Sequence, residues 1–182
     1  MENALSAAIK ENTTPEHQQL EQLVISHLKQ IRSDADYAQL LRNFYAYFSA
    51  VEAVCVPNIS ITGLIDLSSR RDSSFIARDI TELGGNLDNL PAVVVPEINN
   101  LAQAMGAMYV IEGSVLGGPY IVKMLARLGI VNGVSFFSGY GAATGERWKE
   151  FVTALNSLSD PLAQQQAIFT AKETFANFQK VF

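Results

Sequence analysis

Apolar residues recur along most of the chain at intervals of three or four, the spacing that places side chains on one face of an α-helix. One such stripe in the first third of the chain consists of Leu20, Val24, Leu28 and Ile31. Thr14 followed by Pro15 is typical of a helix start, with a capping hydroxyl and a proline in the first turn. We therefore expect a helix that begins at Thr14, preceded by a short helix over about residues 3–12.

The same periodicity predicts five further helices, over about residues 33–57, 68–84, 97–128, 144–158 and from 160 onward. Ser33, Thr144 and Asp160 are suitable N-terminal caps for three of them. Pro57 is expected to end the first of the five, and the Gly84-Gly85 pair closes the second. With about seven helices and no convincing strand pair, the pattern predicts an all-α helical bundle.

Composition adds limits to this picture. A chain of 182 residues fits one domain, and 48% hydrophobic against 17% charged residues is enough for a sizeable core. The formal net charge of −5 argues against nucleic acid as a partner, because such proteins usually carry a basic surface. The first residues lack the basic and apolar segments of a signal peptide, and no run approaches the ~20 apolar residues of a membrane span. We expect a cytoplasmic protein with no membrane insertion and one domain over residues 1–182.

The single cysteine, Cys55, excludes an intrachain disulfide and any cysteine-based metal motif. Its neighbours are Val54 and Val56, an apolar setting that favours a buried thiol over a reactive one.

Two histidines are the candidate metal ligands. His17 lies three residues before Leu20 and extends the apolar stripe, whereas His27 is displaced around the helix and is expected to be peripheral. Glu21 follows His17 by four residues, within reach of its ring, and a carboxylate often orients a metal-bound imidazole. His17 is therefore either an ordinary core histidine or an axial ligand held by Glu21.

A second candidate feature is the run Gly113-Ser114-Val115-Leu116-Gly117-Gly118 inside an otherwise helical segment. Each glycine costs roughly 1 kcal/mol relative to alanine in a helix, so the run needs a compensating role. Glycine permits a bend and a close approach of the backbone to a partner. The partner is either another helix or a flat ligand, and the pattern leaves both open. A phosphate-binding loop fits the run poorly, because no strand precedes the glycines and no Gly-Lys-Ser/Thr ending follows.

Five segments, in this order, make the chain resemble the haem oxygenase family, in particular its bacterial branch. They are KENTTPEHQQLE, RRDSSFIARDITELGGNLDNLP, YVIEGSVLGGPYIVKML, FFSGYGAATGERWKEFVTAL and AKETFANF. The resemblance implies a helical fold that holds haem b between a proximal and a glycine-bent distal helix. It also implies that haem is both cofactor and substrate. O2 and electrons from a reductase or ferredoxin open its ring to biliverdin, with release of CO and ferrous iron.

The resemblance also assigns residues. Thr13, His17 and Glu21 match the proximal motif, with His17 as the iron ligand. The distal motif begins at Tyr109, and within it Gly113, Ser114 and Gly117 are the expected catalytic positions. Gly118 is expected to contact haem. Ser114 stands where many animal members carry an aspartate that organises water.

Haem propionates require cations, and the resemblance points to Lys10 and Lys123, with Arg127 and Arg147 as further candidates. Val152 stands near the position of the family's C-terminal propionate-binding arginine.

Three alternatives remain open from the sequence. The first is a non-catalytic haem or tetrapyrrole carrier on the same fold. The second is a different enzyme on a related helical scaffold, such as a thiaminase-like one, for which Cys55 is poorly placed. The third is a haem-free helical interaction protein.

Overall fold

The computed structural model describes residues 4–182 of the chain, and these residues form helices joined by turns and loops, with no strand among them. The α-helices are α1 (Leu5–Gln30), α2 (Asp34–Ser60), α3 (Ser73–Glu82), α4 (Leu101–Arg127), α5 (Thr144–Asn156) and α6 (Pro161–Gln179). Short 3₁₀ turns at Leu67–Ser69 and Gly141–Ala143 precede α3 and α5. The all-α expectation is confirmed.

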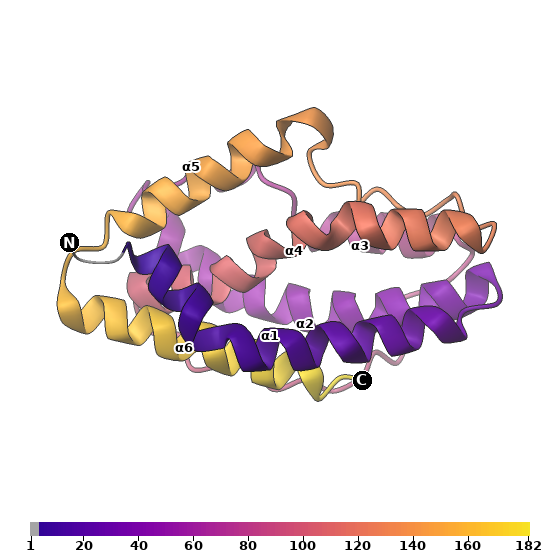
Figure 1. Cartoon of the computed structure of the whole chain (residues 1–182), viewed down its shortest axis with the longest axis horizontal. Helices are drawn as coiled ribbons and strands as arrows, with labels where there is room; N and C mark the ends of the chain where they lie inside the picture. Colours follow the sequence, from indigo (N-terminus) through magenta and orange to yellow (C-terminus); the bar gives the residue numbers. More distant parts are fainter. Residues whose placement is uncertain (1–3) are drawn as a thin grey trace.

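Helix α6 is the main support of the bundle, because it packs along both α4 and α1. Helix α2 packs against α4 and α3, while α1 and α4 touch each other only sparsely. Figure 1 shows α1 and α4 both running along the long axis of the molecule. The two helices are thus held side by side through their shared partner rather than by direct packing, which leaves room between them.

The core beneath that room is aromatic. Phe178 of α6 stacks on Tyr47 at 4.8 Å between ring centroids and meets Phe44 edge-on at 5.0 Å. Phe48 adds a third contact at 5.2 Å. All four side chains are buried, and burying large aromatic rings is among the strongest stabilising terms available to a domain of this size.

The first helix differs from the expectation of two. Residues Leu5–Gln30 form one helix that passes through Pro15, and residue 3, where a short helix was expected to start, lies outside the described residues. The Thr14 hydroxyl does not cap a helix start but donates to the Lys10 carbonyl oxygen at 2.8 Å, one turn earlier. Pro15 leaves the Glu11 carbonyl without its helical donor, and Glu11 is exposed, so solvent can take that place. Merging these two helices gives six α-helices rather than about seven.

A proline also fails to end α2. The expected end at Pro57 is wrong, because the helix continues to Ser60. Ala53, whose carbonyl would have bonded to residue 57, is exposed, and the Asn58 side-chain amide donates to the neighbouring Val54 carbonyl oxygen at 3.0 Å. Proline on the solvent side of a long helix is thus accommodated where the freed carbonyl can be hydrated.

Other helix ends agree more closely with the sequence. Ser33 caps α2 by accepting from the Asp36 backbone N–H, and Asp160 caps α6 by accepting from that of Ala163. Gly84, with φ of +77°, follows α3 as expected. Helix α3 begins only at Ser73, because Asp72 accepts from the Ser74 N–H and caps it there.

Two later boundaries also shift. Thr144 is the first residue of α5 rather than its cap, and its hydroxyl accepts from the Tyr140 N–H. Helix α4 begins at Leu101 and runs unbroken through its glycines and Pro119, although Figure 1 shows its path changing direction along its length. Within residues 4–182, no helix combines the length and apolarity needed to cross a membrane.

Candidate haem-binding cavity

A cavity of about 690 Å³ lies between α1 and α4 and is partly open to solvent. Its floor is the aromatic core, with Phe44, Phe48 and Phe178 among the lining residues. Tyr109, Trp148, Phe175 and Phe137 line it as well. Apart from a few polar groups the walls are apolar, and both the size and this composition fit a small-molecule cofactor site.

His17 supplies the only imidazole among the lining residues that the structure describes. Its ring lies 5.3 Å from that of Phe175, centroid to centroid, at an interplanar angle of 57°. His17 is exposed because the cavity opens toward solvent, and no side chain of residues 4–182 hydrogen-bonds to its ring. The ring nitrogens therefore remain free to bind a ligand. His27 is different: its Nδ1 lies 3.0 Å from the Leu23 carbonyl oxygen, and it does not line the cavity.

Helix α6 fixes the position of α1 around His17. The Gln179 side-chain amide donates to the Glu16 carbonyl oxygen at 2.8 Å, and the Lys172 ammonium lies 3.3 Å from a Glu16 carboxylate oxygen. Both contacts are made to Glu16, the residue immediately before His17, one to its backbone and one to its side chain. The histidine thus stands on a length of helix that is anchored from α6.

The other proximal residues from the sequence interpretation also reach the cavity. Lys10, Thr13 and Glu21 are all lining residues on α1. Thr13 is buried, and its hydroxyl donates to the Ile9 carbonyl oxygen at 2.9 Å. Glu21 follows His17 by one helical turn on the same wall. Lys10 is exposed at the other end of that wall, so its charge is available to an anionic group at the rim.

The distal wall is the glycine-containing part of α4. Tyr109, Gly113, Ser114 and Gly117 all line the cavity. A Cβ at Gly113 would lie 3.5 Å from the Trp148 ring, an ordinary contact, and a Cβ at Gly117 would meet nothing within 4 Å. Burial raises the pKa of the Tyr109 phenol, which keeps it neutral. The wall is therefore thin and uncharged where it faces His17 across the cavity.

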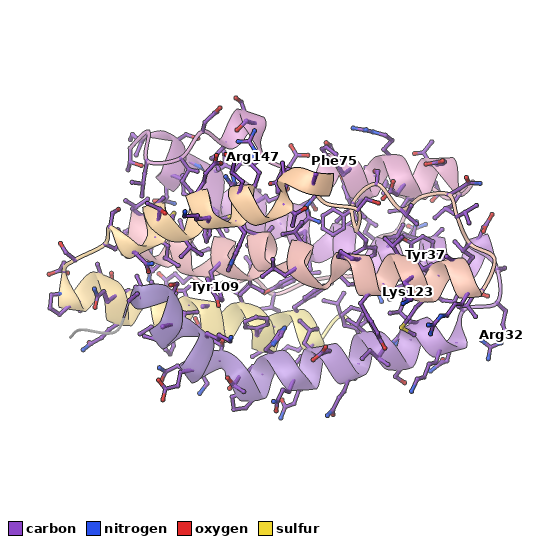
Figure 2. All side chains as sticks on the ribbon, turned by 45° about the horizontal axis from the view of Figure 1, so that its top comes forward. Arg32, Tyr37, Phe75, Tyr109, Lys123 and Arg147 are labelled. Carbon is purple, nitrogen blue, oxygen red and sulfur yellow. The ribbon has the colours of Figure 1, made fainter. Side chains whose placement is uncertain are left out.

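Gly118 and Lys123 do not line the cavity. A Cβ at Gly118 would overlap the Phe137 carbonyl oxygen, so this glycine allows the 129–140 loop to pack on α4. Lys123 is exposed toward the C-terminal end of α4, away from Tyr109 (Figure 2). Arg147 pairs with Glu150 at 3.2 Å, and neither it nor Arg127 is a lining residue.

Behind the distal wall lies a buried polar network that the sequence interpretation missed. Arg70 pairs with Glu112 at 3.0 Å, and the Tyr140 hydroxyl donates to the same carboxylate at 3.3 Å. Arg71 donates to the Ser114 hydroxyl at 2.8 Å. The double arginine was visible in the sequence, but nothing local indicated burial, since arginine is rarely buried without partners and these partners lie about 40 to 77 residues away.

Comparison with known proteins identifies the family of this chain. The family model described as heme oxygenase matches residues 3–182. A curated heme oxygenase of Xanthomonas campestris pv. campestris (strain 8004) is 30% identical over 149 residues, which cover 80% of this chain and 88% of that relative.

Two solved structures share the fold. One is the NO- and CO-bound heme oxygenase from Neisseria meningitidis, with a TM-score of 0.78 and 24% identity over 98% of this chain and 89% of that one. The other is the heme oxygenase from Leptospira interrogans, with a TM-score of 0.78 and 20% identity over 98% of both chains. The match of the family model over nearly the whole chain places this protein in the haem oxygenase family.

Proposed function

We propose that this protein binds haem b in the α1–α4 cavity through His17 and oxidatively opens the ring to biliverdin, releasing CO and ferrous iron. Bound haem supplies the iron that activates O2, and it is also the molecule consumed. Electrons come from an external donor, a reductase or ferredoxin. The observation that carries the proposal is a free imidazole on one wall of a cavity of about 690 Å³, opposite a glycine-rich helix.

The residues present fit such a group. A neutral imidazole is a suitable axial ligand for haem iron, and the His17 ring nitrogens have no competing partner within residues 4–182. The aromatic floor and walls suit a flat apolar macrocycle and exclude bulk water from it. The Gly117 face leaves room for the distal backbone to approach that macrocycle closely.

The polar residues of the cavity have separate roles in this proposal. Glu21 makes no hydrogen bond to the His17 ring in this structure, and in the proposal it accepts one from that ring when haem is bound, as carboxylates commonly do for metal-bound histidines. Lys10 at the rim neutralises a propionate, and Lys123 offers a second cation farther along α4. Ser114 holds a water molecule by its hydroxyl at the distal wall, where protons are required.

Optical titration with ferric haem tests the proposal, with His17→Ala compared against His27→Ala. Both substitutions remove a histidine from α1, but His27 lies outside the cavity and packs on Phe182 at 5.3 Å. We expect one haem per wild-type and His27→Ala protein, and loss of the histidine-ligated spectrum only in His17→Ala. Addition of reductant and redox partner in air should then convert the Soret band into a bilin band.

Two other outcomes would contradict parts of the proposal. Haem that binds through His17 but survives a competent redox partner would identify a carrier. Absence of stoichiometric haem binding by the wild-type protein would remove the assignment of the cavity.

A further inference from the structure

The segment of residues 133–137, between α4 and α5, is held from α3 by one buried carboxylate. Asp79 of α3 is fully buried, and no ion pair within residues 4–182 involves it. Its Oδ1 accepts from the Ser135 N–H at 3.1 Å and from the Ser135 hydroxyl at 2.6 Å, and its Oδ2 accepts from the Phe136 N–H at 2.8 Å. The two oxygens thus bind the N–H groups of consecutive residues and fix the backbone of the segment.

The start of this segment is fixed as well. Gly133 has φ of +66°, and a Cβ there would lie 2.6 Å from the Leu83 side chain, so the segment begins in close contact with the end of α3. The Tyr37 hydroxyl of α2 donates to the Gly133 carbonyl oxygen at 2.9 Å. Burial, with a smaller effect from Asp79, raises the pKa of Tyr37, which keeps this donor protonated. The segment is therefore attached to both α2 and α3.

The end of the segment contacts the distal wall. Phe137 is buried, its ring meets that of Phe44 edge-on at 5.3 Å, and it lines the cavity. Its carbonyl oxygen occupies the place that a Cβ at Gly118 would need. Gly117, the preceding residue of α4, faces the cavity. The position of the segment therefore affects the cavity twice, through the Phe137 ring and through the part of α4 that packs on it.

We propose that Asp79 is a positioning residue of the cavity, which acts through the 133–137 segment on the distal wall. It holds Phe137 and the Gly117–Gly118 part of α4 close to the space opposite His17. The proposal deepens the proposed function, and one of its two tests rests on haem binding. A carboxylate is required, because the NH2 group of Asp79→Asn would face one of two backbone N–H donors. This variant should release one side of the segment and widen the space opposite His17.

The first test needs no haem and measures the coupling between Asp79 and Gly118 in a double-mutant cycle. Urea unfolding is followed for wild type, Asp79→Asn, Gly118→Ala and the double variant. In Gly118→Ala alone, the added methyl overlaps a segment that is fixed in place, whereas in the double variant the segment can yield. The loss of unfolding free energy caused by Gly118→Ala should therefore fall to about half in the Asp79→Asn background.

Gly106 provides a matched control on α4. A Cβ there would overlap the Ala167 carbonyl oxygen of α6, so Gly106→Ala creates a comparable overlap with a different partner. Its effect should be the same in the wild-type and Asp79→Asn backgrounds. Additive losses from Asp79→Asn and Gly118→Ala would overturn the proposal. If Asp79→Asn does not fold, Ser135→Ala, which removes only the hydroxyl bond, takes its place in the cycle with a smaller coupling of the same sign.

The second test uses the ferrous haem complex and alkyl isocyanides, which are neutral iron ligands of graded bulk. The ratio of the affinities for methyl and tert-butyl isocyanide measures the space opposite His17. The preference for the methyl compound should fall about three-fold in Asp79→Asn, because a wall that yields penalises the bulky ligand less. A loss of global stability leaves this ratio unchanged, since the same folded protein binds both ligands.

Asp72→Ala is the control for this ratio. Asp72 is exposed and caps α3 by accepting from the Ser74 N–H at 2.9 Å, so its loss destabilises the helix that carries Asp79 without touching the 133–137 segment. An unchanged preference in Asp79→Asn, or an equal change in Asp72→Ala, would refute the proposal. If wild type binds no haem, the proposed function fails, while the double-mutant cycle still decides the role of Asp79.

Discussion

Two adjacent glycines on α4 have opposite surroundings. Gly117 faces the cavity, and a Cβ there would meet nothing within 4 Å. Gly118 faces the other way, where a Cβ would overlap the backbone of Phe137. The same residue type thus has two roles at neighbouring positions: room for a ligand at one and close packing of a loop at the next.

This contrast predicts opposite effects of alanine on stability. Gly118→Ala should lower the free energy of unfolding by about 1–3 kcal/mol or more, because the loop backbone must move. Gly117→Ala should raise it by about 0.5–1 kcal/mol, since alanine favours the helix and meets no obstacle. Urea unfolding of the two variants measures both changes.

Gly145 on α5 provides the control, because it too has open space around its Cβ position and lies outside the cavity. Gly145→Ala and Gly117→Ala should stabilise similarly, but only Gly117→Ala should alter haem binding. Similar destabilisation by Gly117→Ala and Gly118→Ala would contradict the assignment of separate roles.

At the residue scale, the sequence names candidate residues that line the cavity but does not separate their roles. Spacing alone places His17 on a periodic stripe with Glu21 one turn away but leaves both a core histidine and a ligand open, and the structure adds that both residues line the cavity. The glycine run left packing and ligand contact equally open, and only the long-range contact of Gly118 with Phe137 separates them. Trp148 and Phe175 also line the cavity, but nothing in their local pattern distinguishes a cavity wall from a core.

At the scale of elements, a carboxylate of α2, that of Glu52, hydrogen-bonds to the N-terminus of α3 and connects the two helices. Glu52 of α2 accepts hydrogen bonds from the backbone N–H and hydroxyl of Ser73, the first residue of α3. Burial is the main cause that raises the pKa of Glu52, and the bonds from Ser73 oppose it. The folded protein therefore favours the protonated form of this carboxyl more than the unfolded chain does.

The sign of the resulting pH dependence follows from linkage. A raised pKa in the folded state adds stability that is complete below the ordinary value of 4.5 and is lost as the pH rises through the folded value. Glu52→Gln does not titrate and keeps an oxygen for the Ser73 N–H. We expect this variant to gain stability relative to wild type as the pH rises above the ordinary value of 4.5.

Urea unfolding at several pH values checks this expectation, with Glu82→Gln as an exposed control on α3 for the change in net charge. A stability difference between wild type and Glu52→Gln that stays constant over this pH range would show that Glu52 has no such linkage.

At some helix boundaries, tertiary packing overrides the residues that locally favour a helix start or end. Ser33, Asp160 and Gly84 are local signals, and each acts where the sequence placed it. Pro15 and Pro57 are equally strong local signals, yet both helices continue through them, because each proline lies on an exposed face of a long helix anchored by tertiary packing. The carbonyl four residues before each proline lacks its helical donor, and whether it is exposed to solvent depends on the whole fold, so the local sequence does not predict it.

For the whole molecule, the all-α architecture follows from periodicity alone, but the buried network of Arg70, Arg71 and Glu112 does not. Its members come from a loop and a distant helix, and they meet only because α2, α3 and α4 pack together. The network therefore depends on the assembled bundle rather than on any one segment.

The reactivity of the single thiol, Cys55, measures whether the helical bundle is folded. Cys55 is fully buried, and burial, with a smaller effect from Glu52, raises its pKa to about 12. The thiolate is the reactive form, so we expect native protein to react with Ellman's reagent slower than a free thiol by on the order of a thousand-fold. Labelling rates across a urea series should follow the unfolding transition. Rapid labelling of the native protein would contradict this burial and reopen a chemical role for Cys55.

The anchoring of α1 by α6 has a consequence for synthesis. The Gln179 amide and the Glu16 carbonyl that it binds are 163 residues apart, and Phe175 lies beside His17. At ordinary translation rates, Gln179 leaves the ribosome roughly ten to thirty seconds after Glu16. During that interval the histidine exists but the helix that holds it does not. In the proposed binding mode, nascent chains therefore lack the site that holds haem at His17, and that site is complete only after α6 has left the ribosome and docked on α1.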